Sequence, residues 1–197
     1  MFDFDRCTAD NCNEYSLSGN DLCINHIADS RDFIEGLVEK IKREDVHKDI
    51  KASGCRFTDV NLAGKIFNVC NFSKCEFENT DFSGSQLRLC FFEKAVFKNC
   101  SFKNTNMKYC AFPMSSFENC DFSGSDIINT NFAASSIKGS NFSESDLYFS
   151  VYINAFIKDS KFMDCNVKRA NFWGTKRENV SFKYSNFEEA LFSMGDA

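Results

Sequence analysis

The sequence predicts an all-β solenoid, a coil that turns a corner after every fifth residue. Every fifth residue from Phe57 to Phe192 is apolar with one exception, Arg177, and 18 of these 28 positions are Phe. A second column lies two residues before each of these centres, and 25 of its 28 members are Cys, Ser, Thr or Ala. A period of five fits neither an α-helix nor a simple strand. Two inward positions in five, one large and one small, suit a coil whose large side chains fill the axis while the small ones let the backbone come close.

This pattern resembles the pentapeptide-repeat family. Residues 120–124, Cys-Asp-Phe-Ser-Gly, are a Phe-centred version of the loose family motif Ala-(Asp/Asn)-Leu-x-x. The resemblance implies a right-handed quadrilateral β-helix with four pentapeptides per coil, and therefore about seven coils. We expect this pentapeptide-repeat β-helix over residues 51–197.

A coil of 20 residues predicts which side chains stack on one another. Two mostly aromatic columns are expected on opposite sides of the axis. One begins with Leu62, Phe82, Phe102 and Phe122, and the other with Phe72, Phe92, Phe112 and Phe132. Two charged residues depart from the inward pattern, Lys65 and Arg177. They fall in the first and last coils, where we expect their charges to reach water.

The N-terminal residues 1–28 carry four soft metal ligands. Cys7, Cys12, Cys23 and His26 lie within 20 residues of one another, and the spacing Cys-x2-His lets the last two chelate from a single turn. The set predicts a closed, structural Zn²⁺ site, similar to zinc-knuckle-like CCCH modules. The alternative is three unrelated reduced cysteines and a surface histidine. That alternative leaves a segment with almost no apolar core without anything to hold it folded.

The remaining cysteines fall in the small inward column of the repeat. We expect them to be small apolar fillers with reduced thiols, because the chain shows no secretory signal and the cytoplasm is its expected location. These eight are Cys55, Cys70, Cys75, Cys90, Cys100, Cys110, Cys120 and Cys165.

A capping segment is expected between the zinc module and the rod, over residues 29–50. Residues 29–46 read as an amphipathic helix that Asp29 or Ser30 can cap. Its apolar stripe consists of Phe33, Ile34, Leu37, Val38 and Ile41. We expect this helix to cover the unpaired backbone of the first coil, with a partner helix or dimer element as the alternative. His47 receives no role, and the open C-terminal end is a candidate dimer contact because dimers of the family use that end.

Apolar residues at outward positions predict a partner-binding surface along the rod. The strip comprises Val69, Leu89, Phe91, Tyr109, Ile128, Tyr148, Phe149, Val151, Ile153 and Trp173. A protein partner of unknown identity is one interpretation. Coverage by the N-terminal module, a homodimer, or scattered exposure without meaning are the others.

Charge and composition favour a binding protein over an enzyme. Residues 1–54 hold 7 Lys and Arg against 12 Asp and Glu, whereas the rod is close to neutral, so we expect no direct nucleic-acid binding and no membrane span. The repeat region contains no His and no phosphate-binding Gly motif, which argues against catalysis. We therefore predict a non-enzymatic protein-interaction scaffold or adaptor. The alternative, implied by the resemblance, is a DNA-mimic modulator or protector of a type II topoisomerase (gyrase). That role requires a strongly acidic rod, which the sequence does not provide.

Overall fold

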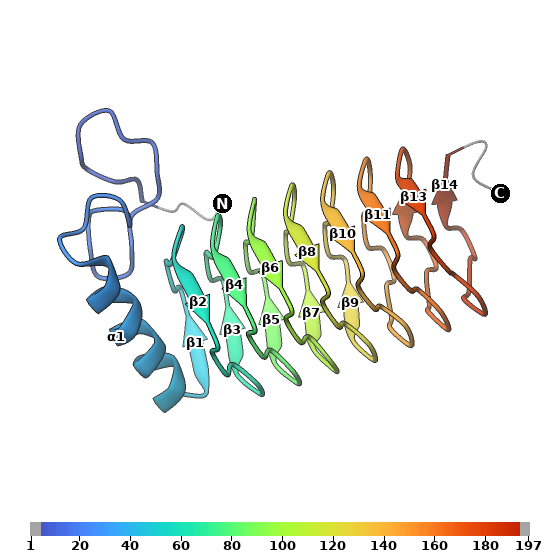
Figure 1. Ribbon diagram of the computed structural model, residues 1–197, viewed down its shortest axis with the longest axis horizontal. Coiled ribbons are helices and arrows are strands. Elements are labelled where there is room, and N and C mark those ends of the chain that lie inside the picture. Colours follow the sequence, from blue (N-terminus) through green and yellow to red (C-terminus); the bar gives the residue numbers. More distant parts are fainter. Residues whose placement is uncertain (1–4, 194–197) are drawn as a thin grey trace.

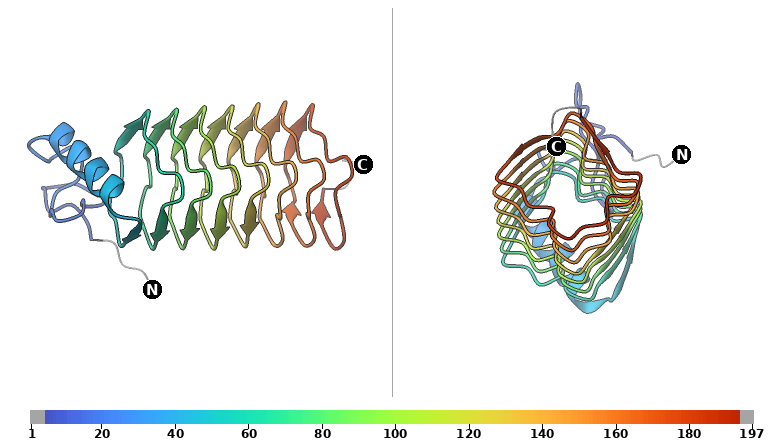
Figure 2. Two further views of the ribbon diagram at one scale, coloured as in Figure 1. Left: turned by 90° about the horizontal axis from the view of Figure 1, so that it is seen from below. Right: turned by 90° about the vertical axis from the view of Figure 1, so that its right-hand side faces the viewer.

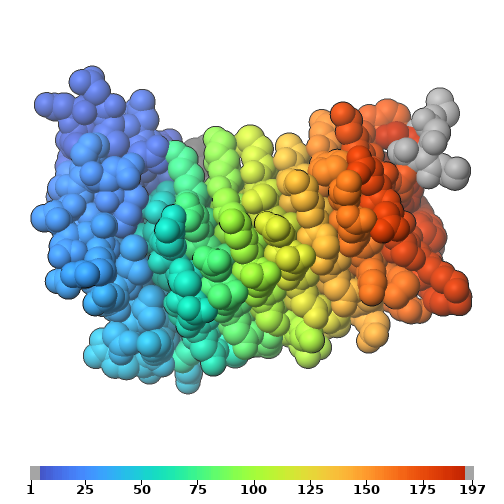
Figure 3. All heavy atoms as spheres, in the orientation of Figure 1, coloured from blue at the N-terminus to red at the C-terminus, as the bar shows by residue number. Residues whose placement is uncertain are grey.

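The protein is a rod of stacked coils with a small module at its N-terminal end, as the computed structural model shows (Figure 1). The structure describes residues 5–193. Seen along the rod, the coils superimpose in a four-sided outline (Figure 2), and in the space-filling view they form closely stacked bands (Figure 3). The predicted parallel β-solenoid of about seven coils is confirmed.

The strands are short, parallel and in register between residues 20 apart, as the pairing of Phe57 with Phe77 illustrates. A five-stranded sheet contains β1 (Val46–Lys48), β3 (Ile66–Asn68), β5 (Gln86–Arg88), β7 (Asn106–Lys108) and β9 (Asp126–Ile128). A seven-stranded sheet contains β2 (Arg56–Thr58), β4 (Glu76–Glu78), β6 (Val96–Lys98), β8 (Ser116–Glu118), β10 (Ser136–Lys138), β11 (Phe156–Lys158) and β13 (Lys176–Glu178). A third sheet pairs β12 (Asn171–Phe172) with β14 (Leu191–Phe192).

Aromatic ladders fill the axis, as the 20-residue spacing predicts. The rings of Phe102 and Phe122 stack with centroids 4.6 Å apart, and those of Phe92 and Phe112 with centroids 4.5 Å apart. The two ladders meet edge to face, for example Phe122 against Phe132 at 6.3 Å. Stacked and T-shaped aromatic pairs each add stabilisation beyond the area they bury. The structure also shows a third ladder that was not predicted, which runs from Phe57 through Phe77 and Phe97 to Phe117.

The small residues of the second inward column also form hydrogen bonds between successive coils. Many of its hydroxyl and thiol groups donate a hydrogen bond to the backbone carbonyl 23 residues earlier, which belongs to the preceding coil. Ser115 Oγ donates to the Phe92 carbonyl at 2.6 Å, and Cys165 Sγ to the Phe142 carbonyl at 3.0 Å. All 11 cysteines are free. Burial raises the pKa of the Cys55 thiol to about 12, so a rod cysteine of this kind stays protonated and unreactive.

Between residues 57 and 189, each pentapeptide turns its corner through a residue in the left-handed region, two positions after the centre. At one corner of the rod these residues are only Asn, Asp and Gly, which tolerate positive φ best. They are Asp59, Asn79, Asn99, Asn119, Gly139, Asp159 and Asn179, with φ between 49° and 59°. Their side chains also bond along the rod, for instance from Asn79 Nδ2 to Asp59 Oδ1 at 2.9 Å.

The solenoid begins earlier than the expected boundary at residue 51. Strand β1 already pairs with β3, so His47 and Ala52 occupy the inward positions directly below Phe67 and Phe72. The His47 ring stacks on Phe67 with centroids 5.0 Å apart. A histidine to which the sequence assigned no role is therefore the first member of an inward column.

Helix α1 (Ser30–Arg43) lies across the end of the rod and covers part of the first coil (Figure 2). The Asp29 side chain caps it by accepting from the Asp32 N–H at 2.9 Å, and Leu37 and Ile41 are buried against the core. It ends at residue 43 rather than 46 because the chain enters β1 at Val46. No helix in the described part of the chain has the length and apolarity needed to cross a membrane.

The two inward charges behave differently from each other. Lys65 reaches the C-terminal end of α1, where its ammonium donates to the Lys42 and Glu44 carbonyls at 3.1 and 2.9 Å and pairs with Asp45 at 2.8 Å. A cation at this position also interacts favourably with the helix dipole. At the other end of the rod, the Arg177 guanidinium lies 4.8 Å from the centre of the Phe192 ring.

Candidate metal centre and partner surface

Short backbone turns bring the four N-terminal ligands together. Cys7 lies beside an antiparallel bridge between Arg6 and Tyr15, and its N–H donates to the Glu14 carbonyl at 2.9 Å. The His26 N–H donates to the Cys23 carbonyl at 3.0 Å, which is the tight turn that the Cys-x2-His spacing predicts.

The four ligand atoms have the separations of a tetrahedral site. All lie within 4.8 Å of one another. Cys12 Sγ and Cys23 Sγ are 3.8 Å apart, and His26 Nδ1 lies 3.4 Å from both Cys7 Sγ and Cys23 Sγ. A tetrahedral zinc ion, with Zn–S of about 2.3 Å and Zn–N of about 2.0–2.1 Å, separates two sulfurs by roughly 3.8 Å and a sulfur from a nitrogen by roughly 3.5 Å. The residues therefore fit such an ion.

The surroundings of Cys7 support the same role, whereas burial raises the pKa of the Cys23 thiol. The Cys23 N–H donates to Cys7 Sγ at 3.3 Å, which orients a ligand from outside the first coordination shell. Although burial opposes the charged form, hydrogen bonds from the backbone of Ala9 and Cys23 and from His26 outweigh it and lower the pKa of Cys7 to about 6. Cys7 is therefore ready to act as a thiolate, which is the form that binds metal.

The N-terminal module, residues 5–28, is fastened to the rod by polar contacts. The Ser18 N–H donates to the Lys51 carbonyl at 2.8 Å, and Ser18 Oγ accepts from the Lys51 N–H at 2.7 Å. Lys74 Nζ pairs with Glu14 at 2.6 Å. The Ile24 side chain lies so close to Gly54 that a Cβ at this position would sit 2.8 Å from Ile24 Cγ2. The module and the rod are thus fitted to each other.

The ten predicted surface residues lie on the outside of the rod. Tyr109, Phe149 and Trp173 are exposed, with 54%, 45% and 55% of their surface accessible. The other seven are half-buried: Val69, Leu89, Phe91, Ile128, Tyr148, Val151 and Ile153. The N-terminal module reaches the strip at Phe91, where Tyr15 and Phe91 line the same hollow of about 220 Å³.

Four members of the strip lie at one corner of the rod, where their backbone adopts the energetically unfavourable left-handed conformation. Val69, Leu89, Tyr109 and Phe149 have φ of 57°, 53°, 58° and 58°. The left-handed region costs an L-residue with a Cβ about 1–2 kcal/mol, and it is least suited to a β-branched or bulky side chain. The corner at residues 59–179 carries only Asn, Asp and Gly in the same conformation. Large apolar residues at the Val69 corner are therefore not explained by the needs of the fold.

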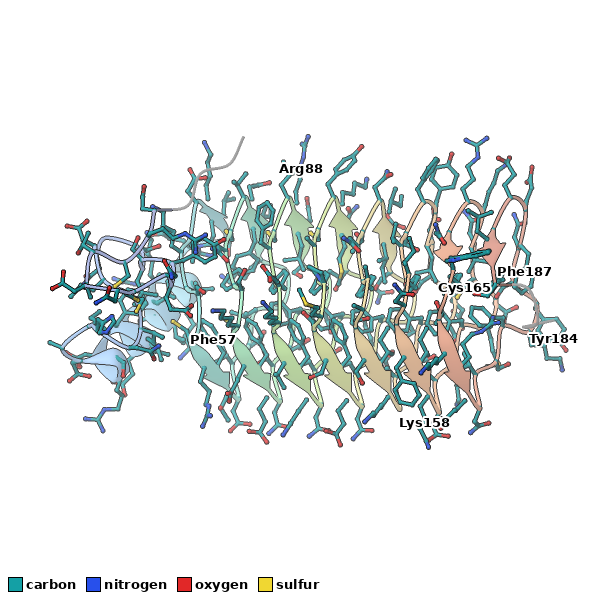
Figure 4. All side chains as sticks on the ribbon, turned by 90° about the horizontal axis from the view of Figure 1, so that it is seen from above. Phe57, Arg88, Lys158, Cys165, Tyr184 and Phe187 are labelled. Carbon is teal, nitrogen blue, oxygen red and sulfur yellow. The ribbon has the colours of Figure 1, made fainter. Side chains whose placement is uncertain are left out.

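An ordered cluster forms where the strip approaches the C-terminal coils. Tyr148 and Phe149 meet edge to face with ring centroids 5.1 Å apart. Arg169 Nη1 donates to the Tyr148 hydroxyl at 3.3 Å, and the guanidinium also pairs with Glu189 at 2.6 Å. Charged residues such as Arg88 and Lys158 also project outward from the rod, and Tyr184 and Phe187 lie in its last coil (Figure 4).

The chain belongs to the pentapeptide-repeat family. It matches a family model described as a pentapeptide repeat region over residues 115–192. It also matches a model of eight-copy pentapeptide repeats over residues 53–88 and 75–112. Neither model describes a catalytic family. Curated proteins provide no match to the chain.

Solved structures of other pentapeptide-repeat and resistance proteins are similar to the chain at low sequence identity. The full-length structure of QnrB1, a plasmid-mediated fluoroquinolone resistance protein, is 15% identical, with 75% of this chain and 84% of that chain covered and a TM-score of 0.43. HetL, a pentapeptide repeat protein involved in heterocyst differentiation regulation from the cyanobacterium Nostoc sp. strain PCC 7120, is 11% identical, with 85% and 98% covered and a TM-score of 0.40.

Sequence reasoning missed the left-handed corner and the roles of His47 and Lys65. The corner leaves a partial signal, since residues two after the centre are often Asn, Asp or Gly. The contacts of Lys65 depend on where α1 ends and leave no signal in the repeat.

Proposed function

We propose that the chain is a non-enzymatic interaction scaffold whose rod presents the apolar strip to a protein partner. The observation that carries this proposal is the Val69 corner, where Val69, Leu89, Tyr109 and Phe149 hold large apolar side chains in the left-handed conformation. Residues kept in a costly backbone conformation point to a role outside folding. An accessible row of such side chains is what a partner surface requires.

The composition of the cluster around Phe149 supports the same function. Binding energy at protein interfaces concentrates in Tyr, Trp and Arg side chains that pack together. Tyr148, Phe149 and Arg169 already contact one another, so little side-chain freedom is left to lose when a partner binds.

We also propose that Cys7, Cys12, Cys23 and His26 hold a structural Zn²⁺ ion. The sulfur and nitrogen separations match tetrahedral coordination, and four protein ligands leave no open position for a reacting water. The ion would keep the module folded against the first coil. The gyrase-directed alternative is not proposed, because its DNA mimicry requires an acidic rod and the repeat region is close to neutral.

Affinity capture from the native cell tests the scaffold function. The bait is the full chain, its double variant Tyr148→Ser/Phe149→Ser, or the matched control Asn99→Ser at the opposite corner. We expect one protein to be retained by the wild type and the control and lost with the double variant, while all three give the same circular dichroism. Equal capture by the double variant, or loss of the fold together with binding, would refute the role of the strip. A parallel capture with a zinc chelator shows whether the module contributes.

A further inference from the structure

A groove lies between helix α1 and strand β2 at the end of the rod. Its volume is about 670 Å³, and its lining includes the apolar side chains of Ile34, Val38 and Val60. Along its margins, α1 contributes the ion pairs Arg31–Glu35 and Glu39–Lys42. α1 thus covers the first coil only in part and leaves an apolar trough beside β2.

The wall of the groove opposite the helix is an open strand edge. Strand β2 is the last strand of the seven-stranded sheet, and β4 is its neighbour on the other side. Toward β4, the Glu76 N–H donates to the Cys55 carbonyl at 3.0 Å and the Asp59 N–H donates to the Glu78 carbonyl at 3.0 Å. Alternate residues of a parallel strand direct their backbone groups to opposite sides. The N–H and C=O groups of Arg56 and Thr58 therefore point into the groove.

On the adjacent face of the same coil, the backbone edge at Lys51 is paired by residues of the N-terminal module. There Ser18 both donates to the Lys51 carbonyl and accepts from the Lys51 N–H, so the N-terminal module completes that edge. Among the described residues, no comparable bond reaches the backbone of Arg56 or Thr58. Within residues 5–193, one face of the first coil therefore has its backbone edge paired, and the face formed by β2 does not.

The positive charge of Arg56 beside the open edge favours an added strand that carries an acidic residue. In the coil stack, Arg56 pairs with Glu76 of the following coil at 2.6 Å, and the Arg56 side chain remains 68% exposed. A residue of a strand added on the groove side, next to Arg56, would lie as far from Arg56 as Glu76 does on the other side. An acidic side chain there would pair with the free side of the guanidinium.

We propose that the groove binds an extended acidic–apolar peptide segment of a partner protein, which adds to β2 as a parallel strand. Its backbone pairs with the N–H and C=O groups of Arg56 and Thr58, one apolar side chain enters the trough at Ile34 and Val38, and an acidic residue lies beside Arg56. Strand addition of this kind draws its affinity from the backbone and its selectivity from alternate side chains. The site is separate from the apolar strip and does not depend on it.

The test uses a peptide that copies β4, the strand that pairs with β2 in the sheet. The probe is fluorescein-labelled Ser-Lys-Ser-Glu-Phe-Glu-Asn-Thr, which copies residues 73–80 with Ser in place of Cys75, and its binding to the zinc-loaded full chain is followed by fluorescence anisotropy. Thr58→Pro removes an N–H that faces the groove, which an edge strand tolerates. Thr58→Val is the matched control that keeps this N–H. We expect saturable binding to the wild type and Thr58→Val, and about tenfold weaker binding to Thr58→Pro.

A charge exchange tests the same site without a proline. Arg56→Glu should weaken the probe, and a second probe with Lys in place of the residue that copies Glu76 should bind Arg56→Glu better than it binds the wild type. Double replacement of Tyr148 and Phe149 should leave probe binding unchanged, so failure here and failure of the scaffold proposal can be told apart.

Four results in these binding and exchange experiments would overturn the proposal, and a fifth, from sedimentation, would do so as well. The four are absence of saturable binding to the wild type, equal binding by Thr58→Pro, lack of recovery in the charge exchange, and slow amide exchange at Arg56 and Thr58 in the free monomer. The last result would mean that a segment of the same chain already occupies the groove. A dimer in sedimentation that Thr58→Pro dissociates would assign the groove to a second copy and would equally refute it.

Discussion

The guanidinium carbon of Arg169 lies 5.7 Å from the centre of the Phe149 ring. The two residues are 20 apart, so each belongs to the same corner of successive coils, and both have positive φ. The solenoid therefore converts a sequence period into a continuous row of side chains on its surface. A protein that keeps Phe and Arg at such a corner orders them before any partner arrives.

Leu89→Asn and Tyr109→Asn should each raise the free energy of unfolding by about 1 kcal/mol, because Asn accepts the left-handed conformation better than Leu or Tyr does. Urea denaturation followed by circular dichroism measures this change. The reverse substitution at the opposite corner, Asn99→Leu, should lower stability by about the same amount. If Leu89→Asn and Tyr109→Asn instead destabilise the rod, packing of these side chains outweighs the cost of their backbone conformation.

The metal module should contain one zinc ion per chain, released when the protein is denatured in the presence of a colorimetric chelator. Cys12→Ser should lower the zinc content sharply, because it removes one of four ligands. Cys110→Ser changes a buried rod thiol and should keep the full zinc content. Equal loss of zinc in both variants, or its absence from the wild type, would exclude the site.

Acidification should destabilise the first coil through His47. Burial lowers the pKa of His47 below its usual 6.5, although the Glu44 carbonyl and carboxylate oppose this shift and Lys65 reinforces it. As pH falls below 6.5, the unfolded chain therefore takes up a proton before the folded chain does, and the free energy of unfolding declines until the folded pKa is passed. Above 6.5 the imidazole is neutral in both states and contributes no pH dependence.

Urea denaturation at pH 7.5 and pH 5.5 measures this effect, with His47→Phe as the comparison. The variant should lose less stability between the two pH values, because it keeps the stack on Phe67 and has no proton to bind. The metal ligands and the charges near His47 are the same in both proteins. An identical pH dependence would show that His47 does not titrate differently in the two states.

The core of the rod should be more sensitive to truncation in its middle coils than in its last coil. Phe112→Ala leaves a cavity between the stacked rings of Phe92 and Phe132 and should cost about 3–5 kcal/mol. Phe187→Ala in the last coil should cost less than about 1 kcal/mol, because that side chain is 46% exposed. Denaturation midpoints and slopes compare the two variants. Similar costs would mean that the terminal coil is more fully buried in solution.

Much of the fold could be predicted because one period dictates it. A Phe at every fifth position determines both the coil and the ladders, and ligand spacing alone predicted that Cys7, Cys12, Cys23 and His26 would meet. The inward positions of His47 and Ala52 were not predicted. They follow from strand pairing with the coil of Phe67 and Phe72, and neither residue is a large apolar one that would have indicated it. The groove beside β2 could not be predicted, since it depends on the angle at which α1 crosses the first coil.

The parallel stacking of the coils has a mechanical consequence. Each coil is joined to the next by backbone hydrogen bonds that run along the rod, so tension applied to the C-terminal end would load the bonds of a single coil at a time. Each rupture would release 20 residues, lengthening the chain by roughly 65 Å. Force would then unfold the rod in regular steps from its C-terminal end, and the coils held by α1 and the N-terminal module would unfold last.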